Sequence, residues 1–495
     1  MKHFILPALF LFLFAPAKAQ PAIHEVVIFP PKPGETRYYY VPFDVPKTTQ
    51  SLTVKYSYDK KGGANVLDMG LFDSLNSGAR NGVTGFRGWS GGRRETVFIS
   101  RATASNGYLH GDIPGGKWQV ILGLYKIVPE GVKVTVTISL NEIDAAALTE
   151  KNTENMKTFN FPKFARTAPP KSNGFTWFRG DLHTHTFHSD GNWTLRSILD
   201  YSLTNNLDFV AITEHNTTSH HHELEELRKS FPKLLVLTGE EITTYGGHIN
   251  VWGLPKGKLI DFRVTPGNAA QLDDALKPVR EMRIPASINH PTAICGGCSW
   301  TYGDDWAGMD SVEIWNGNWD GQEEAALKKW DTLLVAGRRI TAIGSSDSHS
   351  PPSEQNNYGT NLSIGGPTTF IGANKLNQKE ILSAIFSRRV FITNQPDRTI
   401  SLSARKVTIG GEATVPQGKK IAFTITAENF PEGSKLKLIS DGKLLGDHIV
   451  NSKTFSLSPE FEFAANTYFR IEIRDISNKM LAMSNPIFIK TKTNN

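Results

Sequence analysis

Histidine and carboxylate side chains stand at the ends of several short apolar segments of this chain. Ten of the 14 histidines fall between His183 and His349. Imidazole nitrogens and carboxylate oxygens gathered on one face form a site for divalent cations such as Zn, Mn or Fe. A water that bridges two such ions loses a proton near neutral pH and can attack a phosphorus or carbonyl centre. The residues at these segment ends are His183 and His185, His215, Glu241, His290, and Asp347 with His349.

These residues need a scaffold whose strands all end on one face. Between Phe175 and Asn394, apolar strand-like runs alternate with helical patterns, which predicts a parallel sheet or barrel. The carboxyl ends of parallel barrel strands open onto a single face. Period-two alternation marks Leu52 to Leu140 and returns after about Pro396, which predicts a β-sandwich on each flank. The predicted parts are an N-terminal sandwich over 20–165, a linker over 166–174, a barrel over 175–395 and a C-terminal sandwich over 396–495.

Composition places the chain among globular proteins. Its 495 residues are 39% hydrophobic and 21% charged, which excludes long disordered, collagen-like and coiled-coil chains. The net charge of +6 is spread without a Lys/Arg block, so no nucleic-acid partner is expected. Lys2 precedes an apolar run that finishes on Ala17-Lys18-Ala19, which predicts a signal peptide over 1–19. We therefore expect a periplasmic or secreted protein without stable membrane insertion after cleavage, its oligomeric state left open.

Five blocks of the central region carry a family resemblance. In chain order they are RGDLHTHTFHSDG, VAITEHN, TGEEITTYGGHIN, INHP and GSSDSH. Their order and spacing resemble the motifs of the polymerase-and-histidinol-phosphatase (PHP) superfamily of metal-dependent phosphoesterases over about residues 175–395. The resemblance implies a distorted (βα)7-type barrel. With an exported chain and flanking β-domains, the sequence most resembles the CehA/McbA-type branch, which includes carbamate and ester hydrolases.

The resemblance implies two or three divalent ions and a ligand set for each. These sets are His183, His185, Glu241 and Asp347 for the first metal; Glu241, His248 and His290 for the second; and Asp190, His215 and His349 for the third. His248 begins its predicted strand rather than ending it, so its place in the site rests on the resemblance alone. Glu240, beside Glu241, is the alternative carboxylate.

Two positions depart from the family pattern. Glu214 precedes His215 where the family usually has Asp, and we expect it to orient His215. Asp190 stands where some members have a third histidine of the first motif, which leaves the occupancy of the third metal site open.

Further residues are candidates for proton transfer or substrate binding. Asp190 and His188 are the catalytic candidates of the first motif, and His188, the His220–His222 run or a metal-bound water is expected to protonate the leaving group. The His220–His222 run is expected to be solvated. Arg179 and the pair Arg388 and Arg389 are candidates for holding an anionic substrate, although surface ion pairing is the favoured interpretation of the pair.

Cys295 and Cys298 are the only cysteines, and in an exported protein they are expected to form a tight disulfide that fixes the loop after His290. Five aromatic residues follow the cysteines in sequence, and we expect them to form either part of the core or a wall on which a substrate stacks: Trp300, Tyr302, Trp306, Trp315 and Trp319.

The predicted function is that of an exported metal-dependent phosphoesterase acting on a small-molecule phosphate mono- or diester. One alternative uses the same metal centre to hydrolyse a carbamate or carboxylic ester. Another is a non-catalytic protein that binds a glycan or a surface.

Overall fold

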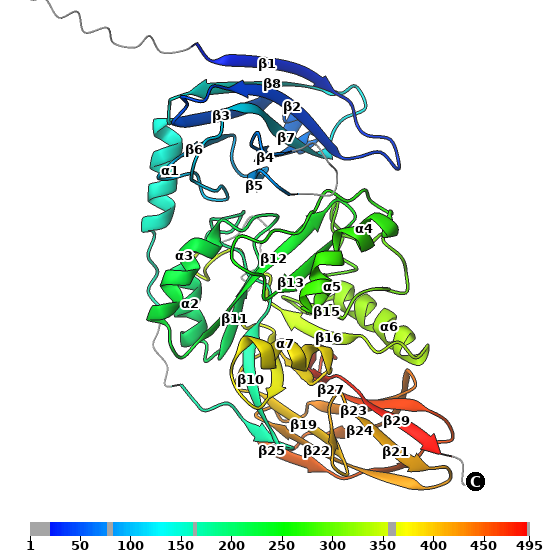
Figure 1. The fold of residues 1–495 in the computed structure, drawn as a ribbon. Helices are drawn as coiled ribbons and strands as arrows, with labels where there is room; N and C mark the ends of the chain where they lie inside the picture. The colour runs from blue at the N-terminus through cyan, green and yellow to red at the C-terminus, as the bar shows by residue number, and fades with distance from the viewer. Residues whose placement is uncertain (1–19, 77–82, 162–165, 355–362, 493–495) are drawn as a thin grey trace, which may run out of the picture.

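The computed structural model describes residues 20–76, 83–161, 166–354 and 363–492, arranged as an N-terminal β-sandwich, a central α/β region and a C-terminal β region (Figure 1). The predicted signal peptide over 1–19 lies outside these residues. Among the described helices, none is both long and apolar enough to cross a membrane.

Two four-stranded antiparallel sheets form the N-terminal sandwich, with the strand orders β1-β8-β3-β6 and β2-β7-β4-β5. Alternate residues of β8 are buried, namely Val132, Val134, Val136 and Ile138, as the period-two pattern predicts. The elements are β1 Ala22–Ile28, β2 Tyr38–Val45, β3 Ser51–Tyr58, a 3₁₀ turn Lys61–Gly63, β4 Val66–Phe72, β5 Phe86–Gly91, β6 Thr96–Ser100, β7 Gly116–Lys126, β8 Val132–Leu140 and α1 Ala145–Met156.

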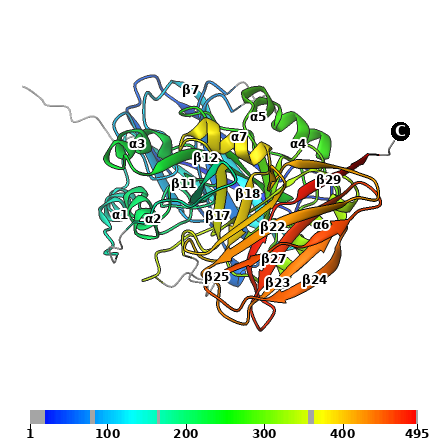
Figure 2. The same ribbon diagram turned by 90° about the horizontal axis from the view of Figure 1, so that it is seen from below.

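The central region is one curved sheet with helices packed against it. Its strand order is β16-β15-β14-β13-β12-β11-β10-β17-β18. The strands are β9 Lys171–Ser172, β10 Phe175–Asp181, β11 Phe209–Ile212, β12 Leu235–Thr244, β13 Gly247–Trp252, β14 Ala286–Asn289, β15 Ser311–Asn316, β16 Thr341–Ser345, β17 Thr368–Ala373 and β18 Val390–Thr393. The helices are α2 Leu195–Thr204, α3 His220–Leu227 with a 3₁₀ turn Arg228–Ser230, α4 Ala269–Ala275, α5 Lys277–Met282, α6 Gly321–Val335 and α7 Gln378–Phe386, the last of which packs against β17 (Figure 2).

The central sheet is mixed, which corrects the prediction of a parallel one. Strands β10, β11 and β12 are parallel, as are β14, β15 and β16, but β13 runs antiparallel to both of its neighbours. Only Tyr245 and Gly246 join β12 to β13, and a connection this short permits an antiparallel pair alone. The first residues of β13 therefore lie at the edge where β12 ends, which brings His248 to the same edge as the strand-end residues.

The two ends of this sheet approach each other without joining. Gly344 N of β16 donates to Thr369 Oγ1 of β17 at 3.0 Å, and Thr341 Oγ1 donates to Ile385 O of α7 at 2.7 Å. No backbone ladder links β16 to β17 or β18 among the described strands. The arrangement is thus an incompletely closed sheet, and the distorted (βα)7-type barrel that the family resemblance implies is not confirmed.

The C-terminal region is built on the same sheet. β18 pairs antiparallel with β28, so the ladder runs across the predicted boundary at 395. Trp177, Phe370 and Phe391 of the central strands share one hydrophobic cluster with the C-terminal strands. The elements are β19 Thr399–Ala404, β20 Val407–Thr408, β21 Glu412–Pro416, β22 Lys420–Glu428, β23 Lys435–Ser440, β24 Lys443–Ile449, β25 Thr454–Leu457, β26 Glu460–Glu462, β27 Thr467–Arg474, β28 Met480–Ser484 and β29 Ile487–Lys492.

Candidate metal centre

Four candidate ligand atoms converge at the edge of the sheet where β10 and β16 end and where β12 carries Glu241. His183 Nε2 lies 3.3 Å from Glu241 Oε2 and 3.2 Å from Asp347 Oδ1. His185 Nε2 lies 3.4 Å and 3.1 Å from the same two oxygens. All four of these atoms are buried and have no hydrogen-bond partner. Buried polar atoms nearly always have partners, so a convergent set without them fits a cation.

Glu241 also faces a second group through its other oxygen. His248 Nδ1 lies 3.1 Å and His290 Nε2 3.4 Å from Glu241 Oε1, and Asn289 Nδ2 donates to the same oxygen at 2.9 Å. Ring nitrogens of His248 and His290 lie within 4.8 Å of each other and of Cys298 Sγ. One carboxylate therefore stands between two groups of candidate ligands.

A third group surrounds Asp190. Its Oδ1 lies 3.2 Å from His349 Nε2 and 3.5 Å from His215 Nε2. The His185 ring stacks between the other two, with centroids 4.3 Å from His215 and 4.2 Å from His349. The structure thus brings together every residue of the three ligand sets that the family resemblance implies.

Two of these residues have a strained backbone. Asp347 has φ 52° and His290 has φ 27°, in the left-handed region that non-glycine residues avoid. Such conformations persist only where the surrounding structure enforces them, and they cluster at functional sites.

The pKa values of the cluster are strongly perturbed. Burial acts against the carboxylate of Asp347, but His183 and its neighbouring histidines hold its pKa well below the usual range. Burial and the rings of His349 and His215 lower the pKa of His185 to about 3. Against the effect of burial, carboxylates raise the pKa of His215 to about 9 and that of His349 to about 10. Without a cation, His215 and His349 therefore hold protons on ring nitrogens that could otherwise bind one.

Sequence reasoning did not single out Glu313, which holds two site residues in place. On β15, its Oε1 lies 3.2 Å from His183 Nδ1, and its Oε2 accepts from His290 N at 3.1 Å and from Asn316 Nδ2 at 2.8 Å. A carboxylate on Nδ1 fixes the ring so that Nε2 points to the ligand position. A lone glutamate in the apolar run SVEIWN was the available signal.

Glu214 and Glu240 have roles that differ from those considered. Glu214 accepts hydrogen bonds from Thr186 and Ser189, so it shapes the first-motif loop, whereas His215 Nδ1 lies 2.6 Å from Thr243 Oγ1. The expectation that Glu214 orients His215 is therefore wrong. Glu240 points to the opposite face of β12 and accepts from Ile260 N at 2.8 Å, and burial raises its pKa well above the usual range.

The N-terminal sandwich contacts the loops of the site at several points, two of which involve buried charged side chains. Arg93 Nη1 donates to Asp190 O at 2.8 Å, and Arg94 donates to Ser189 O at 3.2 Å and to Phe187 O at 2.9 Å. Glu154 of α1 binds both guanidinium groups, at 3.3 Å and 2.6 Å. This cluster fixes the loop that carries Asp190.

The second contact is a buried pair. Tyr245 Oη donates to Asp68 Oδ2 of β4 at 2.5 Å. Burial raises the pKa of Asp68 to about 6, against the opposing effects of Tyr245 and His215.

Other predicted residues lie away from the ligands or in a different environment. His188 belongs to none of the three ligand groups: its Nδ1 lies 2.8 Å from Ser219 Oγ and its Nε2 3.5 Å from Glu223 Oε2. His220 and His221 are buried, which corrects the expectation of a solvated run, while His222 is exposed. They are buried because α3 packs against the sheet, where Leu224 shares one hydrophobic cluster with Ile212 and Val236.

The three candidate arginines are engaged elsewhere. Arg179 is buried, and its Nε donates to Asp208 Oδ2 at 3.0 Å. Arg388 donates to Phe386 O at 3.1 Å and Arg389 to Gly372 O at 3.0 Å. These are carbonyl contacts rather than the surface ion pairs expected.

Most of the aromatic residues near the cysteines are core. Trp306 and Trp315 are fully buried, and Tyr302 and Trp319 nearly so, whereas Trp300 is half-buried. Cys295 and Cys298 form a disulfide, as expected.

No protein-family model matches the chain, and no curated protein matches it. Among solved structures it is similar to a two-domain protein of Bacteroides vulgatus that contains a predicted PHP-like metal-dependent phosphoesterase, with 18% identity over 66% of this chain and 100% of that one and a TM-score of 0.39. An amidohydrolase of Chromobacterium violaceum is 15% identical over 44% of this chain and 97% of that one, with a TM-score of 0.29. A candidate metal-dependent phosphoesterase of Bifidobacterium adolescentis is 18% identical over 41% and 95%, with a TM-score of 0.28. Because these identities and TM-scores are low, the proposed function rests on the residues of the site.

Proposed function

We propose that this protein is a metal-dependent hydrolase of the PHP type that cleaves a small-molecule phosphate ester. The observation that carries the proposal is the convergence of His183 Nε2, His185 Nε2, Glu241 Oε2 and Asp347 Oδ1, all buried and without hydrogen-bond partners.

We assign the three groups to cations in the way that the family motifs imply. The first cation would be held by His183, His185, Glu241 and Asp347, the second by Glu241, His248 and His290, and the third by Asp190, His215 and His349. Zn, Mn or Fe suits imidazole and carboxylate ligands, and when bound such ions lower the pKa of water and polarise the substrate oxygen.

The remaining residues orient the ligands. Glu313 fixes the His183 ring, and Asn289 positions one oxygen of Glu241 while the other oxygen faces the first group. Asn316 Nδ2 donates to Asp347 Oδ2 at 3.3 Å, which leaves Oδ1 free for a cation. These contacts set the ligand directions before any cation arrives, which is the preorganisation that hydrolysis requires.

The position of the arginines favours a second candidate function. Arg179, Arg388 and Arg389 would hold a phosphate, yet each is engaged away from the ligands. Hydrolysis of a carbamate or carboxylic ester needs the same cations but no anion-binding arginine. Motif order and the flanking β-domains support the CehA/McbA-type branch, and the apolar N-terminal segment supports export.

Initial rates on three substrates with one common leaving group distinguish the two functions. The substrates are a phosphomonoester, a phosphodiester and a methylcarbamate, each tested with protein reconstituted with Zn, Mn or Fe. A phosphate ester hydrolysed fastest supports the phosphoesterase and identifies its kind. If the carbamate is hydrolysed fastest and both phosphate esters stay at background, the result supports carbonyl hydrolysis by the same metal centre. Background rates on all three contradict the proposal.

A further inference from the structure

The Cys295–Cys298 disulfide lies against the second group of candidate ligands. Cys298 Sγ is within 4.8 Å of ring nitrogens of His248 and His290, and His290 Nδ1 is buried without a partner. A disulfide sulfur carries no charge and is a poor ligand, whereas a thiolate is a strong one for Zn and similar ions. The oxidation state of this pair therefore decides whether a fourth ligand is available.

We propose that Cys298 is a redox-controlled ligand of the second cation, an inference that rests on the proposed metal centre. In the oxidised protein, His248, His290 and Glu241 supply three ligands and leave one position open. In the reduced protein, Cys298 Sγ occupies that position. Catalytic sites of this kind keep an open position and structural ones close it, so reduction switches hydrolysis off.

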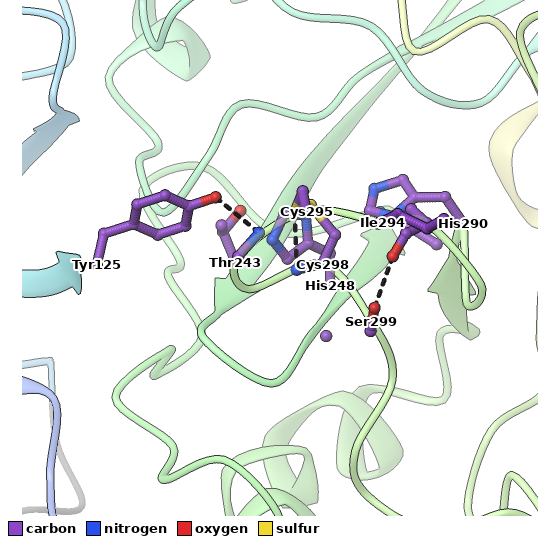
Figure 3. Close-up of a disulfide and its surroundings, with 12 residues drawn as sticks. Tyr125, Thr243, His248, His290, Ile294, Cys295, Cys298 and Ser299 are labelled. Atoms are coloured by element: carbon purple, nitrogen blue, oxygen red, sulfur yellow. Dashed lines mark hydrogen bonds between the residues drawn. A yellow bond between two sulfur atoms is a disulfide. The ribbon is translucent and has the colours of Figure 1, made fainter. Parts of the chain in front are cut away.

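The loop is held in place without the disulfide. Gly247 N, next to His248, donates to Gly297 O at 3.0 Å, and Trp300 N donates to Pro291 O at 3.2 Å. Ser299 Oγ donates to Ala293 O at 2.6 Å, one of the contacts drawn in Figure 3. These bonds flank Cys298 on both sides, so it stays beside the two histidines when the S–S bond is broken.

The two cysteines differ in access. Cys295 is exposed and Cys298 is half-buried against the site. Tyr125 of β7 binds Gly296 N at 3.1 Å, so the N-terminal sandwich supports the loop on the side away from His290 (Figure 3). A reductant therefore reaches Cys295 first.

The redox step is an exchange with a dithiol. A reductant thiolate attacks Cys295 Sγ, the S–S bond breaks, and Cys298 leaves as a thiolate. The second thiol of the reductant then displaces Cys295 and closes the reductant's own disulfide, so two electrons and two protons pass to the protein. When Cys298 binds the cation, its proton goes to solvent.

Cobalt spectroscopy on matched variants tests the proposal without relying on activity. The proteins are the wild type, Cys295→Ser and Cys298→Ser, each loaded with Co²⁺ before and after treatment with dithiothreitol. A thiolate bound to Co²⁺ gives a near-ultraviolet charge-transfer band, while the visible d–d bands report that Co²⁺ is bound at all. Cys295→Ser leaves a free thiol beside the histidines, and Cys298→Ser leaves one that faces solvent.

We expect the charge-transfer band in Cys295→Ser without reductant and in the wild type only after reduction, together with loss of hydrolysis in the reduced wild type. Cys298→Ser should show no such band in either state. Visible bands without a charge-transfer band in Cys295→Ser would overturn the proposal and leave the metal centre standing. No visible bands in any of the proteins would overturn the metal centre itself, and the proposal with it.

Discussion

Replacing Arg94 of the N-terminal sandwich with methionine should loosen the loop of the central region that carries Phe187, Ser189 and Asp190. Arg94 is only 3% exposed, and its guanidinium joins Glu154 of α1 to the carbonyl oxygens of Ser189 and Phe187. Methionine keeps much of the volume and removes every one of these bonds. Of the two arginines of the sandwich, only Arg93 would then still bind the loop that carries Asp190.

The magnitude follows from the burial of the pair. Removing one partner of a buried ion pair costs about 3–5 kcal/mol, because the other charge is left uncompensated. Glu154 would keep Arg93 at 3.3 Å and Asn106 at 2.9 Å, which places the expected loss near the lower value. If the whole loss falls on loop docking, the affinity of the Asp190 group for its cation falls by about 140-fold.

Urea unfolding of the metal-free protein and a cation titration measure the two effects. Arg101→Ala is the matched control, since Arg101 pairs with Asp112 in the same sandwich but is 67% exposed. The free energy of unfolding of Arg101→Ala should be lower than that of the wild type by less than about 1 kcal/mol. If Arg94→Met unfolds at the same urea concentration as Arg101→Ala and binds cations equally well, the role assigned to the N-terminal sandwich is wrong.

The other predictions concern single side chains. Burial raises the pKa of Asp68 to about 6 from 3.8, so its carboxylate destabilises the fold above pH 6, and this cost disappears as the pH falls through 6 towards 3.8. Asp68→Asn should therefore stabilise the metal-free protein at pH 7 by up to about 3 kcal/mol and leave the two proteins alike near pH 4, as measured by urea unfolding; equal stability at both pH values would contradict this assignment. Asp347→Asn should abolish hydrolysis with the circular dichroism spectrum unchanged, and full activity of this variant would remove Asp347 from the site. Glu313→Gln should weaken binding of the first cation by about 10–100-fold, because it removes the negative charge of the carboxylate that faces His183 Nδ1. A calorimetric titration that gives wild-type affinity would rule this role out.

The convergence of most candidate ligands was predictable because strand ends are visible in sequence. His183, His215 and Asp347 each follow a short apolar run, and parallel strands that share an edge must bring such residues together. The family motifs added His248, whose position at the start of a strand gave no local signal. The short turn at Tyr245 and Gly246 explains it, because an antiparallel strand begins where its neighbour ends.

The supporting residues were harder to predict, because they act across long sequence separations. Arg94 meets Ser189 through the docking of one domain on another, and no periodicity reports that contact. Glu214 lies next to His215 in sequence, yet its side chain serves a different loop. The burial of His220 and His221 was missed because a polar run at the start of a helix is usually solvated, and here that turn faces the sheet.

The cation content of three proteins tests the metal centre most directly. Glu241 faces two ligand groups, whereas its neighbour Glu240 points to the opposite side of β12, where burial favours its protonated form. Metal analysis after reconstitution with Zn or Mn should give at least two ions per chain for the wild type and for Glu240→Gln. Glu241→Gln should lose the ions of the first and second groups. Equal content in all three proteins, or no bound ion in the wild type, would contradict the account.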